Sequence, residues 1–169
     1  MTNVDVTWSW RRAAPGDDSF FDRLYEGTRL EEVASWGLEP IQASAFLHAQ
    51  ARVQRGAYAI QFPDAEHRVL LANDEPIGRL ILARGADCWS IVDVSMLPAW
   101  RGRGVGTRAL GEVLEAARAA GRPVRLHVDR QNRARHLYAR LGFLLLPPAP
   151  SAAGSPDQEV APLTMEWRA

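Results

Sequence analysis

One segment, an apolar run followed by three alternating glycines and an amphipathic stretch, constrains the fold of this chain most. Residues 91–96 (IVDVSM) predict a strand, and residues 105–120 predict a helix. Gly102, Gly104 and Gly106 lie around the junction. Glycine tolerates positive φ and lets a ligand approach bare backbone N–H groups, and a helix N-terminus adds unpaired N–H groups and a positive dipole end. The segment therefore predicts a strand–loop–helix unit with an anion site, most often for phosphate.

Arginines surround this loop, at positions 101, 103 and 108. Their guanidinium groups have the fork geometry that suits phosphate oxygens. The alternative is a tight turn that packs a helix close to a strand. A P-loop requires a lysine after its last glycine, but Thr107 follows Gly106 directly. A dinucleotide fingerprint requires a third glycine where Thr107 stands. Neither of these two phosphate loops therefore fits.

Two motifs resemble those of the GNAT acetyltransferase superfamily. Residues 101–106 (RGRGVG) resemble its Arg/Gln-x-x-Gly-x-Gly/Ala signature. Downstream, the predicted strand 124–128, the Asn-x-Ala of residues 132–134 and the Leu-Tyr-x-x-Leu-Gly-Phe of residues 137–143 resemble a second family segment. The resemblance extends over roughly residues 17–167, and its specific residues lie between positions 95 and 143.

This resemblance implies an α/β fold, the GNAT-like acyl-CoA N-acyltransferase fold. Such a fold has a mixed, mostly antiparallel central sheet flanked by helices, with two central strands splayed at the cofactor site. The length of 169 residues predicts a single domain over residues 1–169. Residues 147–157, rich in proline, alanine and serine, are predicted to form a flexible loop.

Hydrophobic periodicity and turn residues predict the individual elements. Strands are expected at residues 4–12, 68–72, 77–84, 89–96, 124–129, 143–146 and 159–167. Helices are expected at residues 17–27, 30–35, 40–55, 105–120 and 133–141.

Charge and cysteine content limit the possible partners and compartment. The chain has 20 arginines, no lysine and 20 acidic residues, so its net charge is zero, which argues against nucleic acid or an anionic membrane as the main partner. Its single cysteine, Cys88, cannot form an internal disulfide, which predicts a reducing, cytoplasmic location. A monomer or homodimer is expected. Cys88 and the four histidines lack metal-ligand spacing, so no metal is expected. No apolar stretch approaches the roughly 20 residues of a membrane span, and the first residues do not resemble a signal peptide.

The resemblance implies acetyl-coenzyme A (acetyl-CoA) as co-substrate. Its pyrophosphate would bind the loop, and its pantetheine arm and thioester carbonyl would meet the backbone at the end of the strand. Asn132 would bond the arm, although Asn is also a favoured helix N-cap. The implied cofactor-binding residues are Met96, Leu97, Arg101, Gly102, Arg103, Gly104, Val105, Gly106, Thr107, Asn132 and Tyr138.

Two residues are candidates for catalysis. Tyr138, with a reference pKa of about 10, is protonated at neutral pH, and by the resemblance it would donate a proton to the departing thiolate. The alternative is a packing residue one turn before Gly142. Asp93 shares a strand face with Ser95 and could take the proton of the amine. Its alternative is an ion pair with an arginine on a neighbouring strand, such as Arg79 or Arg125. His127 is a further candidate base, although packing explains it more simply.

The acceptor pocket would lie at the front helices, whose aromatic and charged residues suit a small polar amine or an amino-acid-like ligand. The candidates are Arg29, Glu32, Trp36, Phe46, Gln50 and Tyr58, most of which are explained equally by core or surface positions. The predicted function is an N-acetyltransferase that acts on an amine of a small molecule or peptide by direct transfer in a ternary complex. Cys88 lies at the start of its strand, away from the loop, so an acyl-cysteine is not expected. The alternative is a non-catalytic acyl-CoA-binding sensor or interaction module of the same fold.

Overall fold

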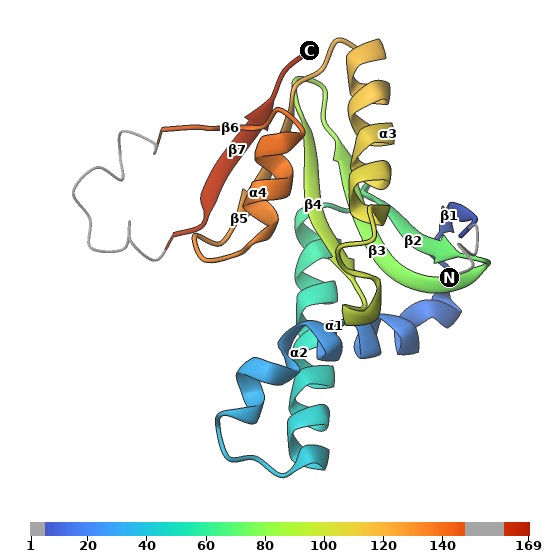
Figure 1. The fold of residues 1–169 in the computed structure, drawn as a ribbon, viewed down its shortest axis with the longest axis vertical. Helices are drawn as coiled ribbons and strands as arrows, with labels where there is room; N and C mark the ends of the chain where they lie inside the picture. Colours follow the sequence, from blue (N-terminus) through green and yellow to red (C-terminus); the bar gives the residue numbers. More distant parts are fainter. Residues whose placement is uncertain (1–5, 148–160) are drawn as a thin grey trace, which may run out of the picture. The chain divides into compact units, whose positions relative to one another are not determined.

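A computed structural model describes residues 6–147 and 161–169 of the chain (Figure 1). Its strands are β1 (Trp8–Arg12), β2 (Glu66–Ala72), β3 (Glu75–Arg84), β4 (Trp89–Met96), β5 (Val124–Val128), β6 (Leu144–Leu145) and β7 (Leu163–Trp167). Its helices are α1 (Asp18–Ala34), α2 (Pro40–Gln61), α3 (Val105–Ala119) and α4 (Ala134–Arg140), with short 3-10 turns η1 (Pro15–Asp17) and η2 (Pro98–Trp100). Among these described helices, none is both long and apolar enough to cross a membrane.

Within the described residues the strands follow the order β1-β2-β3-β4-β5-β7-β6 in one sheet. The pairs β1/β2, β2/β3, β5/β7 and β6/β7 are antiparallel, and β4/β5 is parallel. The parallel ladder pairs Trp89 with Val124 and Ile91 with Leu126, and β4 then continues to Met96. This mixed, mostly antiparallel sheet with flanking helices confirms the predicted fold class.

The front helices differ most from the prediction. Residues expected to form two helices form the single helix α1, which passes through Gly27. A side chain at Gly27 would bring its Cβ within 3.1 Å of Pro98 Cδ, so glycine serves close packing here and does not end the helix. Helix α2 begins at Pro40, as predicted, but continues to Gln61. The first and last strands begin later than predicted, with residues 4–5 and 159–160 outside the described part of the chain.

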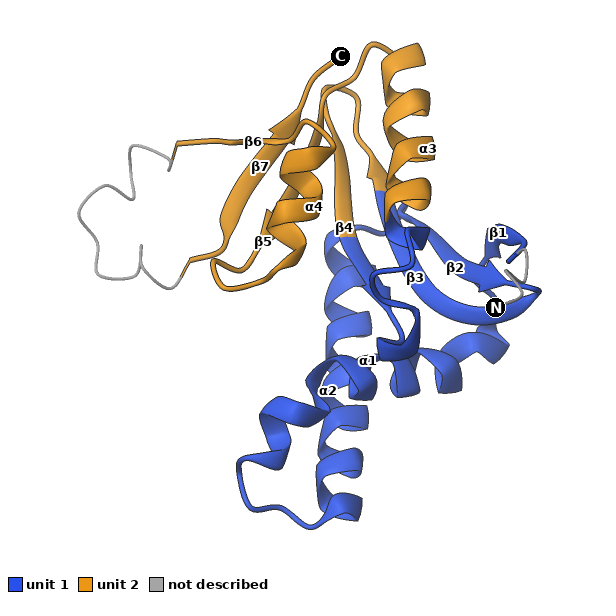
Figure 2. Ribbon diagram, viewed as in Figure 1, with its two compact units in different colours: residues 1–82, 93–106 blue, residues 83–92, 107–169 orange. Residues whose placement is uncertain are grey.

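The chain divides into two compact units (Figure 2). The first comprises residues 1–82 and 93–106, and the second comprises residues 83–92 and 107–169. Strand β4 belongs to both, because its first half, 89–92, lies in the second unit and its second half, 93–96, in the first. The predicted single domain stays a prediction. Of the predicted flexible loop, residues 148–157 lie outside the described residues.

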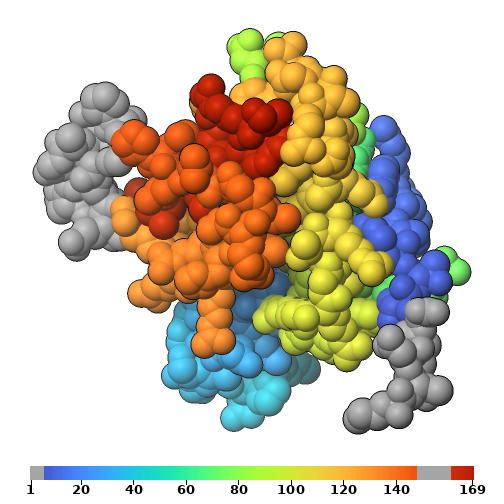
Figure 3. Space-filling view, turned by 45° about the horizontal axis from the view of Figure 1, so that its top comes forward, coloured from blue at the N-terminus to red at the C-terminus, as the bar shows by residue number. Residues whose placement is uncertain are grey.

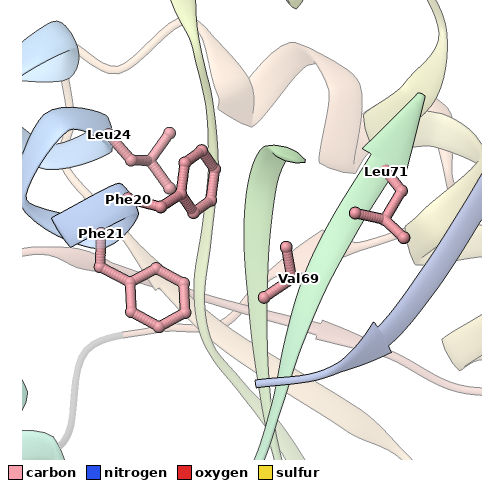
Figure 4. Packing of buried hydrophobic residues seen from close by; sticks show 5 residues of the cluster. All are labelled: Phe20, Phe21, Leu24, Val69 and Leu71. Atoms are coloured by element: carbon pink, nitrogen blue, oxygen red, sulfur yellow. The ribbon is translucent and has the colours of Figure 1, made fainter. Parts of the chain in front are cut away.

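In the first unit, helix α1 packs against strand β2 (Figure 4). Phe20, Phe21 and Leu24 of the helix meet Val69 and Leu71 of the strand, and all five are buried. The strand residues alternate along β2, as expected for one face of a sheet. Burying each large apolar side chain contributes about 1.5–3 kcal/mol. A second cluster, Val33 with Ala43 and Leu47, joins α1 to α2.

In the second unit, β5 shows a clear alternation of buried and exposed residues. Val124, Leu126 and Val128 are buried, whereas Arg125 and His127 are exposed. In β7, the antiparallel partner of β5, Met165 and Trp167 are buried. The buried residues of helix α3 include Leu110, Val113, Leu114 and Ala117. The predicted strand and amphipathic helix are therefore confirmed.

Candidate functional site

The glycine loop begins where β4 ends and leads through η2 into α3. Gly102 has φ +71° and Gly104 has φ +81°, a left-handed conformation that strongly favours glycine. A Cβ at either position would meet no atom within 4 Å, so the backbone angle, not space, requires glycine. Residues 101–104 are exposed, and this yellow to yellow-green part of the chain reaches the surface in Figure 3.

The loop presents backbone donors that the protein itself does not use. Within the described chain, the N–H groups of Gly102, Arg103 and Gly104 donate to no other backbone group. The N–H groups of the first turn of α3, which starts at Val105, have no intrahelical acceptor by geometry. Together these donors give the segment the backbone arrangement expected of an anion site, and anion binding there stays a prediction.

Two of the loop arginines are held by the protein. The Arg101 guanidinium donates from Nε to the carbonyl oxygen of Met96 and from Nη2 to that of Gly27, both at 3.3 Å. It therefore fastens the loop to the end of β4 and to α1. The guanidinium carbon of Arg103 lies 5.0 Å from the ring centroid of Trp100, at the exposed surface.

The end of β4 is held tightly against β3. The Leu97 N–H donates to the Ile77 carbonyl at 2.9 Å, and the Leu97 carbonyl accepts from the Trp100 N–H at 2.9 Å. A Cβ at Gly78 would lie 2.6 Å from the Ser95 carbonyl oxygen, so β4 approaches a bare glycine. The N–H of Leu97 is thus committed to the sheet, and the predicted coenzyme contacts of Met96 and Leu97 stay predictions.

Asp93 of β4 forms a part-buried ion pair with Arg79 of β3. Asp93 Oδ2 lies 2.8 Å from both Nε and Nη2 of Arg79, and it also accepts from Ser95 Oγ at 3.0 Å. The Arg79 side chain is 6% exposed and that of Asp93 is 20% exposed. Arg79 Nη2 donates further to Gln54 Oε1 of α2 at 3.2 Å. The expected alternative, an ion pair between Asp93 and a neighbouring arginine, is confirmed with Arg79 as the partner.

The charges of this ion pair contribute to the pKa shifts of two further side chains, Tyr58 and His67. Burial raises the pKa of Tyr58, and the Asp93 carboxylate raises it further, so the phenol keeps its proton. Burial and the Arg79 charge both lower the pKa of His67, against the opposing effect of Asp93, so the imidazole is neutral at pH 7. The cluster of Gln54, Tyr58, His67, Arg79, Asp93 and Ser95, here called the Asp93 cluster, lies within the first unit.

Sequence reasoning did not assign Gln54 and His67 to a site. Gln50, Gln54 and Tyr58 are spaced four residues apart on α2 and therefore share one helix face, a signal that could have identified Gln54. His67 gave no comparable signal, because its position beside Arg79 depends on how β2 and β3 pair.

The other predicted acceptor residues interact mainly with their neighbours on α1 and α2. Trp36 and Phe46 meet edge to face, with ring centroids 5.7 Å apart. Arg29 Nε pairs with Glu32 at 2.8 Å on the helix surface, and the Tyr25 hydroxyl donates to Gln50 at 3.4 Å.

In the second unit, Tyr138 and Asn132 both have structural contacts. The Tyr138 ring is buried and meets Phe143 edge to face, with centroids 5.9 Å apart. Asn132 Oδ1 accepts the N–H of Ala134, the first residue of α4, at 2.9 Å, but Arg133 occupies the N-cap position, so the expected N-cap role of Asn132 is wrong by one residue. The proposed coenzyme roles of both residues are compatible with these contacts and stay predictions.

Two other candidates are His127, considered as a base, and Cys88, considered as a nucleophile. His127 Nδ1 lies 3.1 Å from Thr164 Oγ1 on the exposed face of β5. Burial raises the pKa of the free Cys88 thiol, which disfavours the nucleophilic thiolate. Among the described side chains no group of three or more His, Cys, Asp or Glu is placed to hold a metal ion.

Comparison with known proteins identifies one family and several similar structures. A family model described as "Acetyltransferase (GNAT) family" matches residues 21–143. No curated protein matches the sequence. The PaiA N-acetyltransferase of Thermoplasma acidophilum, solved in complex with coenzyme A, is 15% identical with a TM-score of 0.69, covering 96% of this chain and 99% of that chain.

Two further structures give the same result. A GCN5-related N-acetyltransferase of Rhodopseudomonas palustris is 20% identical with a TM-score of 0.65, covering 96% of each chain. Ard1 of Thermoplasma volcanium is 17% identical with a TM-score of 0.62, covering 95% of this chain and 97% of that chain. At these identities the likeness establishes the fold.

Proposed function

Because this chain belongs to the acetyltransferase (GNAT) family, we propose that it transfers an acetyl group from acetyl-CoA to a primary amine of a small molecule or peptide. The observation that carries the proposal is the exposed loop before α3, with left-handed Gly102 and Gly104 and uncommitted N–H groups. The coenzyme A complex of the Thermoplasma acidophilum relative supports the choice of cofactor.

In this proposal the coenzyme pyrophosphate binds the N–H groups of residues 102–107. Arg103 adds a positive charge at the loop surface, and Arg101 acts indirectly, by fastening the loop to Met96 and Gly27. The end of β4, through the backbone of Met96 and Leu97, contacts the pantetheine arm. Asn132 contributes an additional polar contact to that arm.

The reaction needs two proton movements. The amine nitrogen attacks the thioester carbonyl carbon, and the carbon–sulfur bond of the tetrahedral intermediate then breaks. Tyr138 gives its phenolic proton to the departing thiolate, and Asp93 takes a proton from the nitrogen after it has attacked. The second carboxylate oxygen of Asp93, Oδ1, can accept this proton, because Arg79 and Ser95 bond only Oδ2 among the described contacts of the carboxylate. The products are the amide and the free thiol.

Transfer is direct, from coenzyme to amine in a ternary complex. The raised pKa of Cys88 supports this, because the thiol form is a poor nucleophile. Since one cysteine cannot form an internal disulfide, we also propose a reducing, cytoplasmic location.

One observation favours a second candidate, an acyl-CoA-binding module without catalysis. Asp93 is held by Arg79 at 2.8 Å, the arrangement that a purely structural ion pair would also have. Such a module would retain the glycine loop and bind acyl-CoA, but it would transfer nothing.

Thermal unfolding with acetyl-CoA, free coenzyme A and ATP tests the proposal. A ligand that binds only the folded chain at 100 times its Kd adds about 2.7 kcal/mol, which for a chain of this length raises Tm by roughly 5–10 °C. We expect this shift with both coenzyme forms and no shift with ATP, followed by thiol release in the presence of an amine. A shift without thiol release for any amine would indicate the binding module. No shift with saturating coenzyme would overturn both functions.

A further inference from the structure

We infer that the acceptor is a weakly basic primary amine, which binds in its neutral form, and not an alkylammonium ion. The inference rests on the proposed function and names its substrate class. It follows from the charge balance of the Asp93 cluster in the first unit.

The negative charge of Asp93 is already matched. Arg79 holds Oδ2 with two nitrogen atoms at 2.8 Å, and a guanidinium stays charged at any relevant pH. Arg79 cannot turn toward water, because its side chain is buried, donates to Gln54 and lies 5.4 Å from the ring centroid of Phe21. The carboxylate and guanidinium together therefore carry no net charge.

The side chains around this pair add no uncompensated negative charge. Tyr58 of α2 keeps its proton and His67 of β2 is neutral at pH 7. Tyr25 of α1 donates its hydroxyl proton to Gln50.

Two acids on α1 contact residues of α2. Asp22 bonds Arg55 at 2.5 Å, and Glu26 lies 3.0 Å from His48 Nε2. Asp93 is the one carboxylate of the Asp93 cluster as defined above, and it is paired with Arg79, so the cluster lacks an unpaired carboxylate that would hold an ammonium ion.

Amine basicity then determines which acceptors react. A nitrogen must be unprotonated to attack, and an aspartate carboxylate, with a reference pKa of about 3.9, takes almost no proton from a free alkylammonium ion, whose reference pKa is about 10.4. An α-amino group has a reference pKa of about 7.7–8.0, against about 10.4 for a lysine side chain. At pH 7.5 about a third of the former is neutral but only about 0.1% of the latter, a difference of roughly 250-fold. After attack the nitrogen becomes far more acidic, and Asp93 can then accept its proton.

Amines of graded basicity test the inference on the unmodified enzyme. The probes are alanine amide for an α-amine, 4-aminobenzoate for an aromatic amine, and Nα-acetyl-lysine amide and spermidine for alkylamines. Thiol release from acetyl-CoA gives kcat/KM for each probe between pH 7 and pH 9. We expect alanine amide or 4-aminobenzoate to exceed both alkylamines by at least ~100-fold at pH 7.5.

The pH dependence provides a second readout. We expect kcat/KM for the alkylamines to rise about tenfold per pH unit, following the neutral fraction of the amine. A flat alkylamine profile, or an alkylamine that matches the weakly basic probes at pH 7.5, would overturn the inference. Absence of transfer with every probe, together with no coenzyme-induced Tm shift, would overturn the proposed function and this inference with it. A Tm shift without transfer to any amine would indicate the binding module and overturn the proposed transfer together with this inference, whereas either of the two alkylamine results above would overturn the inference alone.

Two variants test whether the preference for weakly basic amines depends on the ion pair between Arg79 and Asp93. Arg79→Gln leaves Asp93 uncompensated, so we expect the preference for weakly basic over alkyl amines to fall at least tenfold. Arg11→Gln removes another part-buried ion pair of the first unit, with Asp17, which is not among the pairs named above, and should leave that preference unchanged. The ratio of two kcat/KM values does not depend on the folded fraction, so partial unfolding of either variant does not obscure it. An unchanged ratio in folded Arg79→Gln would contradict the role given to Arg79.

Discussion

Replacing Gly78 with alanine tests how closely β3 must approach the end of β4, at Ser95 and Met96, just before the segment that leads into the glycine loop. A Cβ there would lie 2.6 Å from both the Ser95 carbonyl oxygen and Met96 Sδ. The thioether can rotate away, but the carbonyl belongs to β4, so the strand itself must move. Overpacking of this kind costs about 1–3 kcal/mol, and alanine recovers about 0.4–1 kcal/mol by restricting the unfolded chain. The net loss is about 1–2 kcal/mol.

For a chain of this length such a loss lowers Tm by roughly 2–8 °C. Because Met96 leads directly into the loop, we also expect several-fold weaker coenzyme A binding by titration calorimetry. The matched control is Gly56→Ala on α2, where a Cβ meets nothing within 4 Å and alanine should add about 0.5–1 kcal/mol of helix stability. If Gly78→Ala melts at or above the wild-type temperature while Gly56→Ala behaves as expected, the close approach of the two strands is refuted.

Three further predictions concern the loop, the proposed acid and the stability of the fold. Gly104→Val forces a β-branched residue into φ +81°. Titration calorimetry should then show at least tenfold weaker coenzyme A binding, while the variant still unfolds cooperatively. Unchanged affinity would exclude the loop as the coenzyme site. Tyr138→Phe removes only a hydroxyl, so kcat should fall about 10²-fold or more with little change in coenzyme affinity, whereas equal turnover would leave Tyr138 as a packing residue. The Arg11 hydrogen bond is the main cause that holds the pKa of the Asp17 carboxyl below its usual value in the folded chain. The unfolded chain therefore protonates Asp17 more readily than the folded chain does. The stabilisation from the ion pair is present above about pH 4 and is lost as the pH falls through the lowered pKa of the folded chain. In urea unfolding, Asp17→Asn should therefore be less stable than wild type at pH 7, with the gap narrowing toward pH 2–3; a constant gap would argue against the pairing.

The elements that sequence patterns predicted well are those whose pattern reflects local geometry. Strand β4 and the start of α3 at Val105 match because alternation, three glycines and an amphipathic stretch all act within one short segment. A contact between the Asn132 side chain and the start of α4 also follows from local sequence, although the N-cap itself is Arg133.

The less accurate predictions depend on partners that are distant in sequence. Gly27 indicated a helix end, but Pro98 occupies the space that its missing side chain leaves. The partner of Asp93 stayed open between Arg79 and Arg125 because strand order decides it, and Arg125 in fact pairs with Glu166. Such features follow from tertiary packing, which periodicity in a single sequence does not encode.

The use of arginine throughout the described ion pairs, with His48 as the one other basic partner, has a consequence for any protein that holds an acyl thioester. A guanidinium remains protonated and does not attack a carbonyl, whereas a lysine side chain near the donor would slowly acylate itself. With no lysine in its sequence, this chain has no side-chain amine that could compete with the true acceptor. Acyl label that appears on the protein during turnover must therefore be sought on a terminal amine, an imidazole, the Cys88 thiol or a hydroxyl group, so a stable amide on a side chain is not expected.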